Sequence, residues 1–85
     1  MLDVTIVSPY EILFSGKAVS VSSKNSKGTF DILSEHAKFI TIIENSPIII
    51  KKDNSEEKTF SFPLAIIYVN EDKLKIYAQL EFPKI

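Results

Sequence analysis

The sequence predicts an all-β protein, a flattened β-sandwich or barrel, and three observations carry that prediction. Apolar and polar residues alternate with a spacing of two in segment after segment, which is the period of a strand with one buried face. Pro, Gly, Asn, Asp and Ser separate these segments, and no span longer than about one turn keeps a helical period. Roughly eight or more short strands in one open sheet would expose an apolar face, so two packed sheets are expected.

The first half of the chain divides at three breaks. Ser8-Pro9 ends the first strand, because proline lacks an N–H and fixes its own φ. Ser15-Gly16 interrupts the next segment, and the loop 24–28 precedes another alternating run. The side chains expected to point inward are Leu2, Val4, Ile6, Ile12, Phe14, Val19, Val21, Phe30 and Ile32.

The second half begins with a short bend over 34–38, followed by a strand over 39–43, a turn over 44–47 and a strand over 48–50. A hairpin around Asp53-Asn54-Ser55 would place Lys51-Lys52 across from Glu56-Glu57, and each opposite-charge pair adds a few tenths of a kcal/mol. A tight turn is expected over 70–73. The inward side chains of this half are Phe60, Phe62, Ile67, Val69, Leu74, Ile76 and Ala78.

Three apolar residues, Ile49, Ile66 and Tyr68, have the outward parity on strands whose inward positions are already apolar. Strands that are apolar on both faces are expected to be buried on both. These side chains therefore belong either to an interface with another molecule or to a local cluster under a loop.

Length, charge and composition narrow the class of protein. The 85 residues predict one domain, 1–85, and the chain has no cysteine for disulfides, thiol chemistry or zinc-thiolate sites. The N-terminus lacks the h-region of a signal peptide, and every apolar run is far shorter than the roughly 20 residues that span a bilayer. The net charge is −1 and every basic residue is lysine, which argues against nucleic acid as a partner.

Catalytic chemistry finds little support in the sequence. His36 is the one candidate base that titrates near neutral pH, and its neighbours Ser34 and Glu35 suggest a triad. On a short bend these three side chains diverge, so a histidine bonded to the bend's own backbone is expected instead. One histidine with scattered acids does not make a metal shell, and the glycines stand singly rather than in a phosphate-binding loop. No catalytic residue, metal or cofactor is expected, and the chain is interpreted as a non-enzyme.

Three stretches carry a family resemblance. "GTFDILSEHAKFIT", residues 28–41, resembles the pattern G-x-F-G-I-L-P-x-H-A-P-L-L-T of the epsilon subunit of the rotary (F-type) ATP synthase. "DVTIVSPYEILFSGKAVSVS" and "FSFPLAIIYVNEDKLKIYAQ" are similar to the first hairpin and the last strands of the same N-terminal domain. The resemblance covers nearly the whole chain and implies a flattened sandwich of two roughly five-stranded sheets.

The resemblance also implies a function. The chain would be a non-catalytic rotor subunit of the central stalk, which links the gamma subunit to the polar loops of the membrane c ring and couples proton flow to ATP synthesis. It would lie on the cytoplasmic (or matrix or stromal) face of an energy-transducing membrane and touch that membrane only through the complex. The implied partner contacts are Ser8, Thr29, Phe30, Asp31, His36 and Thr41, with His36 at the junction of the two partners.

Departures from the family pattern keep a second interpretation open. Asp31 and Leu64-Ala65 replace glycines, and Thr29 occupies a position that is often acidic in the family, so a charge contact with the ring loops is expected to be lost. The alternative is a sandwich repurposed as an adaptor or structural module that self-associates through its edges or apolar faces. The sequence ends in "QLEFPKI", and Pro83 discourages a helix, so the family's C-terminal helical hairpin is not expected here. Ser34 and Lys38 replace family prolines.

Overall fold

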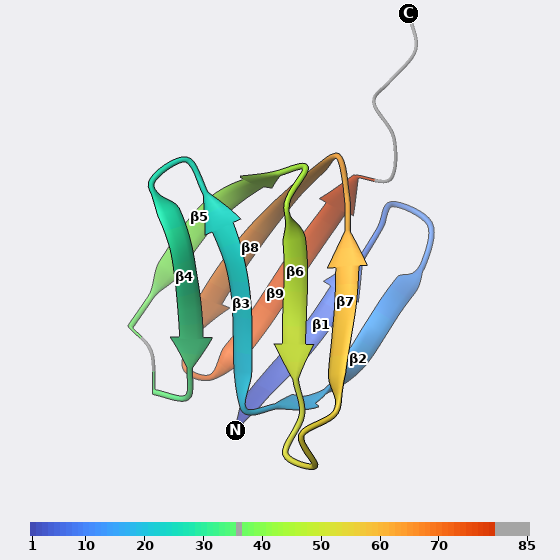
Figure 1. Ribbon diagram of the computed structural model, residues 1–85. Coiled ribbons are helices and arrows are strands. Elements are labelled where there is room, and N and C mark those ends of the chain that lie inside the picture. The colour runs from blue at the N-terminus through green and yellow to red at the C-terminus, as the bar shows by residue number, and fades with distance from the viewer. Residues whose placement is uncertain (36, 80–85) are drawn as a thin grey trace, which may run out of the picture.

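The computed structural model describes residues 1–35 and 37–79, and in that part of the chain it contains nine strands and no helix (Figure 1). The strands form two sheets that lie face to face, so the predicted all-β sandwich is confirmed. One sheet has five strands and the other has four, where about five were expected in each. The strands are β1 (Leu2–Val7), β2 (Ile12–Ala18), β3 (Ser20–Asn25), β4 (Gly28–Leu33), β5 (Phe39–Glu44), β6 (Pro47–Lys51), β7 (Glu57–Ser61), β8 (Leu64–Asn70) and β9 (Lys73–Gln79).

Four strand pairs join neighbours in sequence, and three pairs, β1 with β9, β5 with β8 and β3 with β6, join strands that are distant in sequence. Sheet A has the order β2-β1-β9-β8-β5, and sheet B has the order β4-β3-β6-β7. All pairs are antiparallel except β1 with β9, in which the first and last strands run side by side and Val4 pairs with Leu74. Sheet A is therefore complete only after the last strand has joined the first.

The core lies between the sheets and consists of the inward positions of the strands. Aliphatic side chains fill its centre, and aromatic pairs close its two sides. Phe14 and Phe60 meet at 5.7 Å between centroids on the side of β2 and β7, while Phe30 and Phe39 meet at 5.5 Å on the side of β4 and β5. The buried apolar residues are Leu2, Val4, Ile6, Ala18, Val21, Ile32, Ile43, Ile48, Ile50, Phe62, Ala65, Ile67, Val69, Leu74, Ile76 and Ala78.

Two of the predicted inward positions are wrong or incomplete. Ile12 is 65% exposed, because the pairing of β1 with β2 shifts from Ile6 with Phe14 to Val7 with Ile12 and so inserts an extra residue. Val19 is only half-buried, since the chain passes from sheet A to sheet B at this residue, and Ala18 takes the buried position instead.

The predicted hairpins are present. Lys51 pairs with Glu57, and the Lys52 ammonium lies 3.7 Å from the Glu56 carboxylate. The two-residue turn between β8 and β9 has positive φ angles at Glu71 (52°) and Asp72 (62°), the combination of a type I′ turn that follows the twist of the strands.

The residues that the resemblance places at family glycine positions lie in ordinary strand conformations. Asp31 is in β4 and pairs with Ser22, whereas Leu64 and Ala65 begin β8 and pair with Gln79 and Ala78. None of these three replacement residues has a positive φ. The substitutions are therefore accommodated without left-handed backbone strain.

Candidate docking surface

The outer face of sheet A carries a row of apolar side chains that crosses four strands. Ile42 of β5 pairs with Ile66 of β8, Ile66 pairs with Tyr77 of β9, and Tyr77 pairs with Val7 of β1. Paired residues on one face of a sheet point the same way, so these side chains form a continuous strip. Ile42 is 56% exposed and Tyr77 is 47% exposed.

A second row widens the strip on one side. Ile40 of β5 pairs with Tyr68 of β8, and Tyr68 pairs with Lys75 of β9. Single exposed apolar residues are normal on a protein surface, whereas a contiguous apolar patch is typical of an interaction site or a ligand-binding groove. We call this surface the outer apolar patch; it consists of Val7, Ile40, Ile42, Ile66, Tyr68 and Tyr77.

The opposite face of the sandwich has a different character. The outward positions of sheet B are mainly hydroxyl and charged side chains, and the Ser22 hydroxyl donates a hydrogen bond to the Asp31 carboxylate. Pro47, Ile49, which is half-buried, and Leu33, at the end of β4, are the apolar exceptions. The sandwich therefore presents one apolar face and one polar face. The polar outward residues of sheet B are Ser20, Ser22, Lys24, Thr29, Asp31, Lys51, Glu57, Thr59 and Ser61.

The predicted contact residues of β4 do not join the outer apolar patch. Thr29 and Asp31 are exposed on the outer face of sheet B, whereas Phe30 points inward and packs against the ring of Phe39. A partner that touches Thr29 and Asp31 would therefore approach a different side of the sandwich from one that covers the patch.

The other predicted contacts lie elsewhere. Ser8 follows β1, and its hydroxyl accepts hydrogen bonds from the N–H groups of Tyr10 and Glu11, both at 3.2 Å. It borders a hollow of about 300 Å³ that Ile66 and Tyr77 of the patch also line. Thr41 points toward sheet B, where its hydroxyl accepts a hydrogen bond from the Asn25 amide at 3.0 Å. His36 lies outside the described residues.

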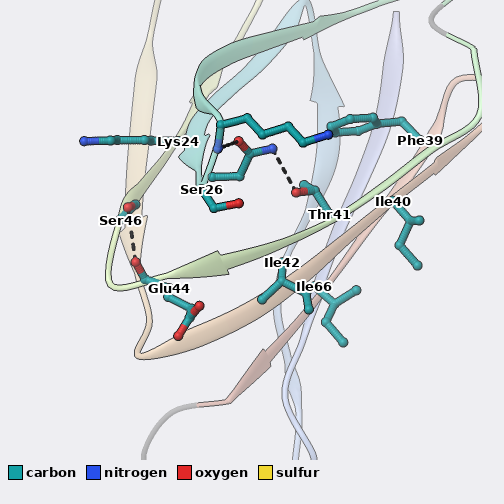
Figure 2. A pocket seen from close by; sticks show the side chains of 11 residues that line it. Lys24, Ser26, Phe39, Ile40, Thr41, Ile42, Glu44, Ser46 and Ile66 are labelled. Atoms are coloured by element: carbon teal, nitrogen blue, oxygen red, sulfur yellow. Dashed lines mark hydrogen bonds between the residues drawn. The ribbon is translucent and has the colours of Figure 1, made fainter.

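A groove of about 910 Å³ follows β5 between the outer apolar patch and the turn that joins β3 to β4. Figure 2 shows Ile40, Ile42 and Ile66 pointing to one side of β5, with Phe39 and Thr41 pointing to the other. One wall of the groove is therefore aliphatic. The opposite wall is polar, with Asn25, Ser26, Lys27 and Thr41.

The sequence reveals only part of this surface. Ile66 and Tyr68 stand out because the inward positions of β8 are apolar too, and the structure places both on the outer apolar patch. Ile40, Ile42 and Tyr77 are missed, although each has the outward parity of its strand. The available signal was that parity, but the sequence does not say which strands are neighbours in the sheet.

The described residues offer little reactive chemistry. Among residues 1–35 and 37–79, no three His, Cys, Asp or Glu side chains are grouped as ligands for a metal ion. No helix in this part of the chain is long and apolar enough to cross a membrane. The Lys17 ammonium lies 2.6 Å from the Asp3 carboxylate, and its hydrogen bond holds the pKa of Asp3 below the ordinary value.

A β-sandwich with an exposed apolar strip on one outer face has a surface suited to contact with another protein. Residues 1–81 match the family described as ATP synthase, delta/epsilon chain, beta-sandwich domain, and the chain belongs to this family.

Curated relatives are consistent with this assignment. The ATP synthase epsilon chain of Sulfurimonas denitrificans is 27% identical over 78 residues, which are 92% of this chain and 60% of the relative. The ATP synthase epsilon chain of Clostridium novyi is 31% identical over 71 residues, which are 84% of this chain and 54% of that relative. The chain thus spans between 54% and 60% of the length of these two relatives.

Solved structures share the fold. A chain in the cryo-EM structure of the Euglena gracilis mitochondrial ATP synthase, with OSCP, F1 and c-ring, aligns with a TM-score of 0.83 at 10% identity and covers 91% of this chain and 49% of its own length. A chain in the central stalk and c-ring structure of the Tetrahymena thermophila mitochondrial ATP synthase aligns with a TM-score of 0.73 at 19% identity. This alignment covers 91% of the present chain and 62% of the Tetrahymena chain. At these identities the likeness concerns the fold.

Proposed function

We propose that this chain is the β-sandwich part of a non-catalytic central-stalk subunit of an ATP synthase, which links the gamma subunit to the c ring and so couples proton flow to ATP synthesis. Such a subunit transmits torque, which requires a stiff body and contact surfaces rather than an active site. The two packed sheets with a closed apolar core supply the stiff body.

The outer apolar patch is the observation that carries the proposal. Ile42, Ile66 and Tyr77 lie in register across sheet A, and no described part of the chain covers them. Burying apolar surface is worth about 25 cal/mol per Å², so a protein partner that covers this strip gains affinity from it. We assign the patch to the gamma subunit, because membership in the ATP synthase delta/epsilon family makes a central-stalk partner the natural occupant.

The remaining contacts divide between the partners. Ser8 borders the patch and is assigned to the gamma side. Thr29 and Asp31 lie on β4, away from the patch, and are assigned to the ring loops together with the adjoining Phe30, although Thr29 brings no negative charge. Thr41 on β5, and His36 by the family resemblance, belong to the junction between the partners. In this arrangement the subunit meets the membrane through the complex, on the face that carries F1.

Co-expression of the natural full-length protein with the gamma subunit from the same source tests the proposal. The two proteins are expected to elute together in size-exclusion chromatography at micromolar concentration. Separate elution would contradict the rotor function.

The exposed patch also suits the alternative, a module that self-associates, because a second copy would bury the same side chains. Sedimentation of the isolated natural protein distinguishes the two. A monomer that forms a heterodimer on addition of gamma supports the rotor function, whereas a stable homodimer that ignores gamma supports the alternative.

A further inference from the structure

β5 differs from the other edge strands in the position of its charged residues. The edge strands β2, β4 and β7 each carry charged residues before their last position: Lys17, Asp31, and Glu57 with Lys58. Charges and irregular pairing on edge strands oppose the addition of further strands. β5 is paired with β8 in unbroken register, and its one charged residue is the last, Glu44. Among the edge strands that the structure describes, β5 is the least protected.

The pairing pattern identifies which backbone groups of β5 face its open edge. The Asn45 N–H donates to the Pro63 carbonyl at 3.2 Å, directly beyond the pair of Glu44 with Leu64. Hydrogen-bonded and non-hydrogen-bonded pairs alternate in an antiparallel ladder. Ile43 and Thr41 therefore bond to β8, and Ile40, Ile42 and Glu44 direct their N–H and C=O groups to the open edge.

The Glu44 carbonyl already accepts a hydrogen bond from the Ser46 hydroxyl at 3.2 Å. The N–H and C=O groups of Ile40 and Ile42 are thus the central unused positions of the edge. They belong to the same two residues whose side chains are 66% and 56% exposed on the outer apolar patch.

The groove along β5 specifies what a sixth strand would look like. Its outward side chains would continue the aliphatic surface of Ile40, Ile42 and Ile66, and its inward side chains would meet the polar wall with Asn25 and Lys27. The fitting segment is extended, apolar at every second position, and polar between them with an acidic residue beside Lys27.

We propose that β5 accepts such a segment of the gamma subunit as a sixth strand of sheet A. The proposal rests on the proposed function, because the open edge is continuous with the outer apolar patch and the protein that covers the patch is the one in position to supply the strand. Backbone pairing at Ile40 and Ile42 then fixes the angle at which the partner is held, while the patch supplies apolar area.

Residue-resolved hydrogen exchange of the natural full-length protein, alone and with the gamma subunit from the same source, tests the proposal. The amides of Ile40 and Ile42 are expected to exchange at least about tenfold more slowly in the complex, whereas Thr41 and Ile43 are slow in both states. A complex in which Ile40 and Ile42 exchange as in the free protein would overturn strand addition and leave the rotor function standing. Absence of any complex would overturn both.

Two pairs of variants provide independent readouts. Ile42→Pro removes an N–H at the open edge, where proline is tolerated, and Ile42→Ala removes the side chain but keeps that N–H. Gamma is expected to bind Ile42→Pro about tenfold more weakly than Ile42→Ala, and equal affinities would contradict backbone pairing.

The second pair tests the acidic position of the partner. Lys27→Glu is expected to weaken gamma binding about tenfold at low salt, and its matched control is Lys24→Glu. Lys24 also lines the groove, but Figure 2 shows its side chain pointing away from Ile40 and Ile42, so this control should leave binding unchanged. Equal effects of the two variants would contradict a specific acidic contact at Lys27.

Discussion

Ile42 on β5 and Ile66 on β8 are paired in register and lie side by side on the outer face of sheet A, where the two residues are 56% and 38% exposed. A pair at the centre of an apolar strip is where a docking partner gains most, because central, fully desolvated side chains dominate binding energies. Ile66→Ser is expected to weaken gamma binding by about 2 kcal/mol, roughly 30-fold, as measured by isothermal titration calorimetry.

Leu33→Ser is the matched control for Ile66→Ser, since Leu33 is also exposed, at 56%, but lies on the outer face of sheet B. It should leave gamma binding unchanged. Both variants should keep the free energy of unfolding within about 1 kcal/mol of the parent, because neither residue belongs to the core. If the two variants weaken binding equally, the outer apolar patch is not the docking surface.

The alternation of apolar residues predicted most of the buried core, because a period of two determines which side chains share a face once a strand is formed. Ile12 and Val19 were misplaced for physical reasons that alternation does not contain: an extra residue in the pairing of β1 with β2, and a passage between sheets. The docking surface was harder to predict. Its continuity depends on β5, β8, β9 and β1 being neighbours, and the open edge of β5 depends on the strand order of sheet A.

The centre of the core offers a stability prediction. Ile67 and Ile76 pair across β8 and β9, and both side chains are fully buried. Ile76→Ala removes buried apolar area and leaves a cavity, so the free energy of unfolding should fall by about 2 to 5 kcal/mol in urea titrations. Lys75→Ala, at the exposed neighbouring position, should change it by less than about 0.5 kcal/mol. A small loss for Ile76→Ala would mean that the site collapses to fill the space.

The turn between β8 and β9 predicts a stabilising substitution. Glu71 adopts a left-handed conformation with φ of 52°, which a residue with a long side chain enters at a cost and asparagine tolerates better. Glu71→Asn should raise the free energy of unfolding by about 0.5 to 1 kcal/mol, measured by urea titration. Glu11→Asn, in the loop after β1, lacks a positive φ and should give no such gain. An equal gain from both would point to surface charge as the cause.

Asp3 and Lys17 link stability to pH. The hydrogen bond from Lys17 lowers the folded pKa of Asp3 below its ordinary value of 3.8. The ionised carboxylate therefore favours the folded state above that value, and its contribution disappears as the pH falls through the lowered folded pKa. Asp3→Asn should be less stable than the parent at pH 7, and the difference should shrink as the pH is lowered below about 4. Urea titrations at neutral and acidic pH measure this difference. Asp53→Asn, in the exposed turn between β6 and β7, controls for the loss of one negative charge. If the difference in the free energy of unfolding between the parent and Asp3→Asn stays constant with pH, the ion pair is not the source of that difference.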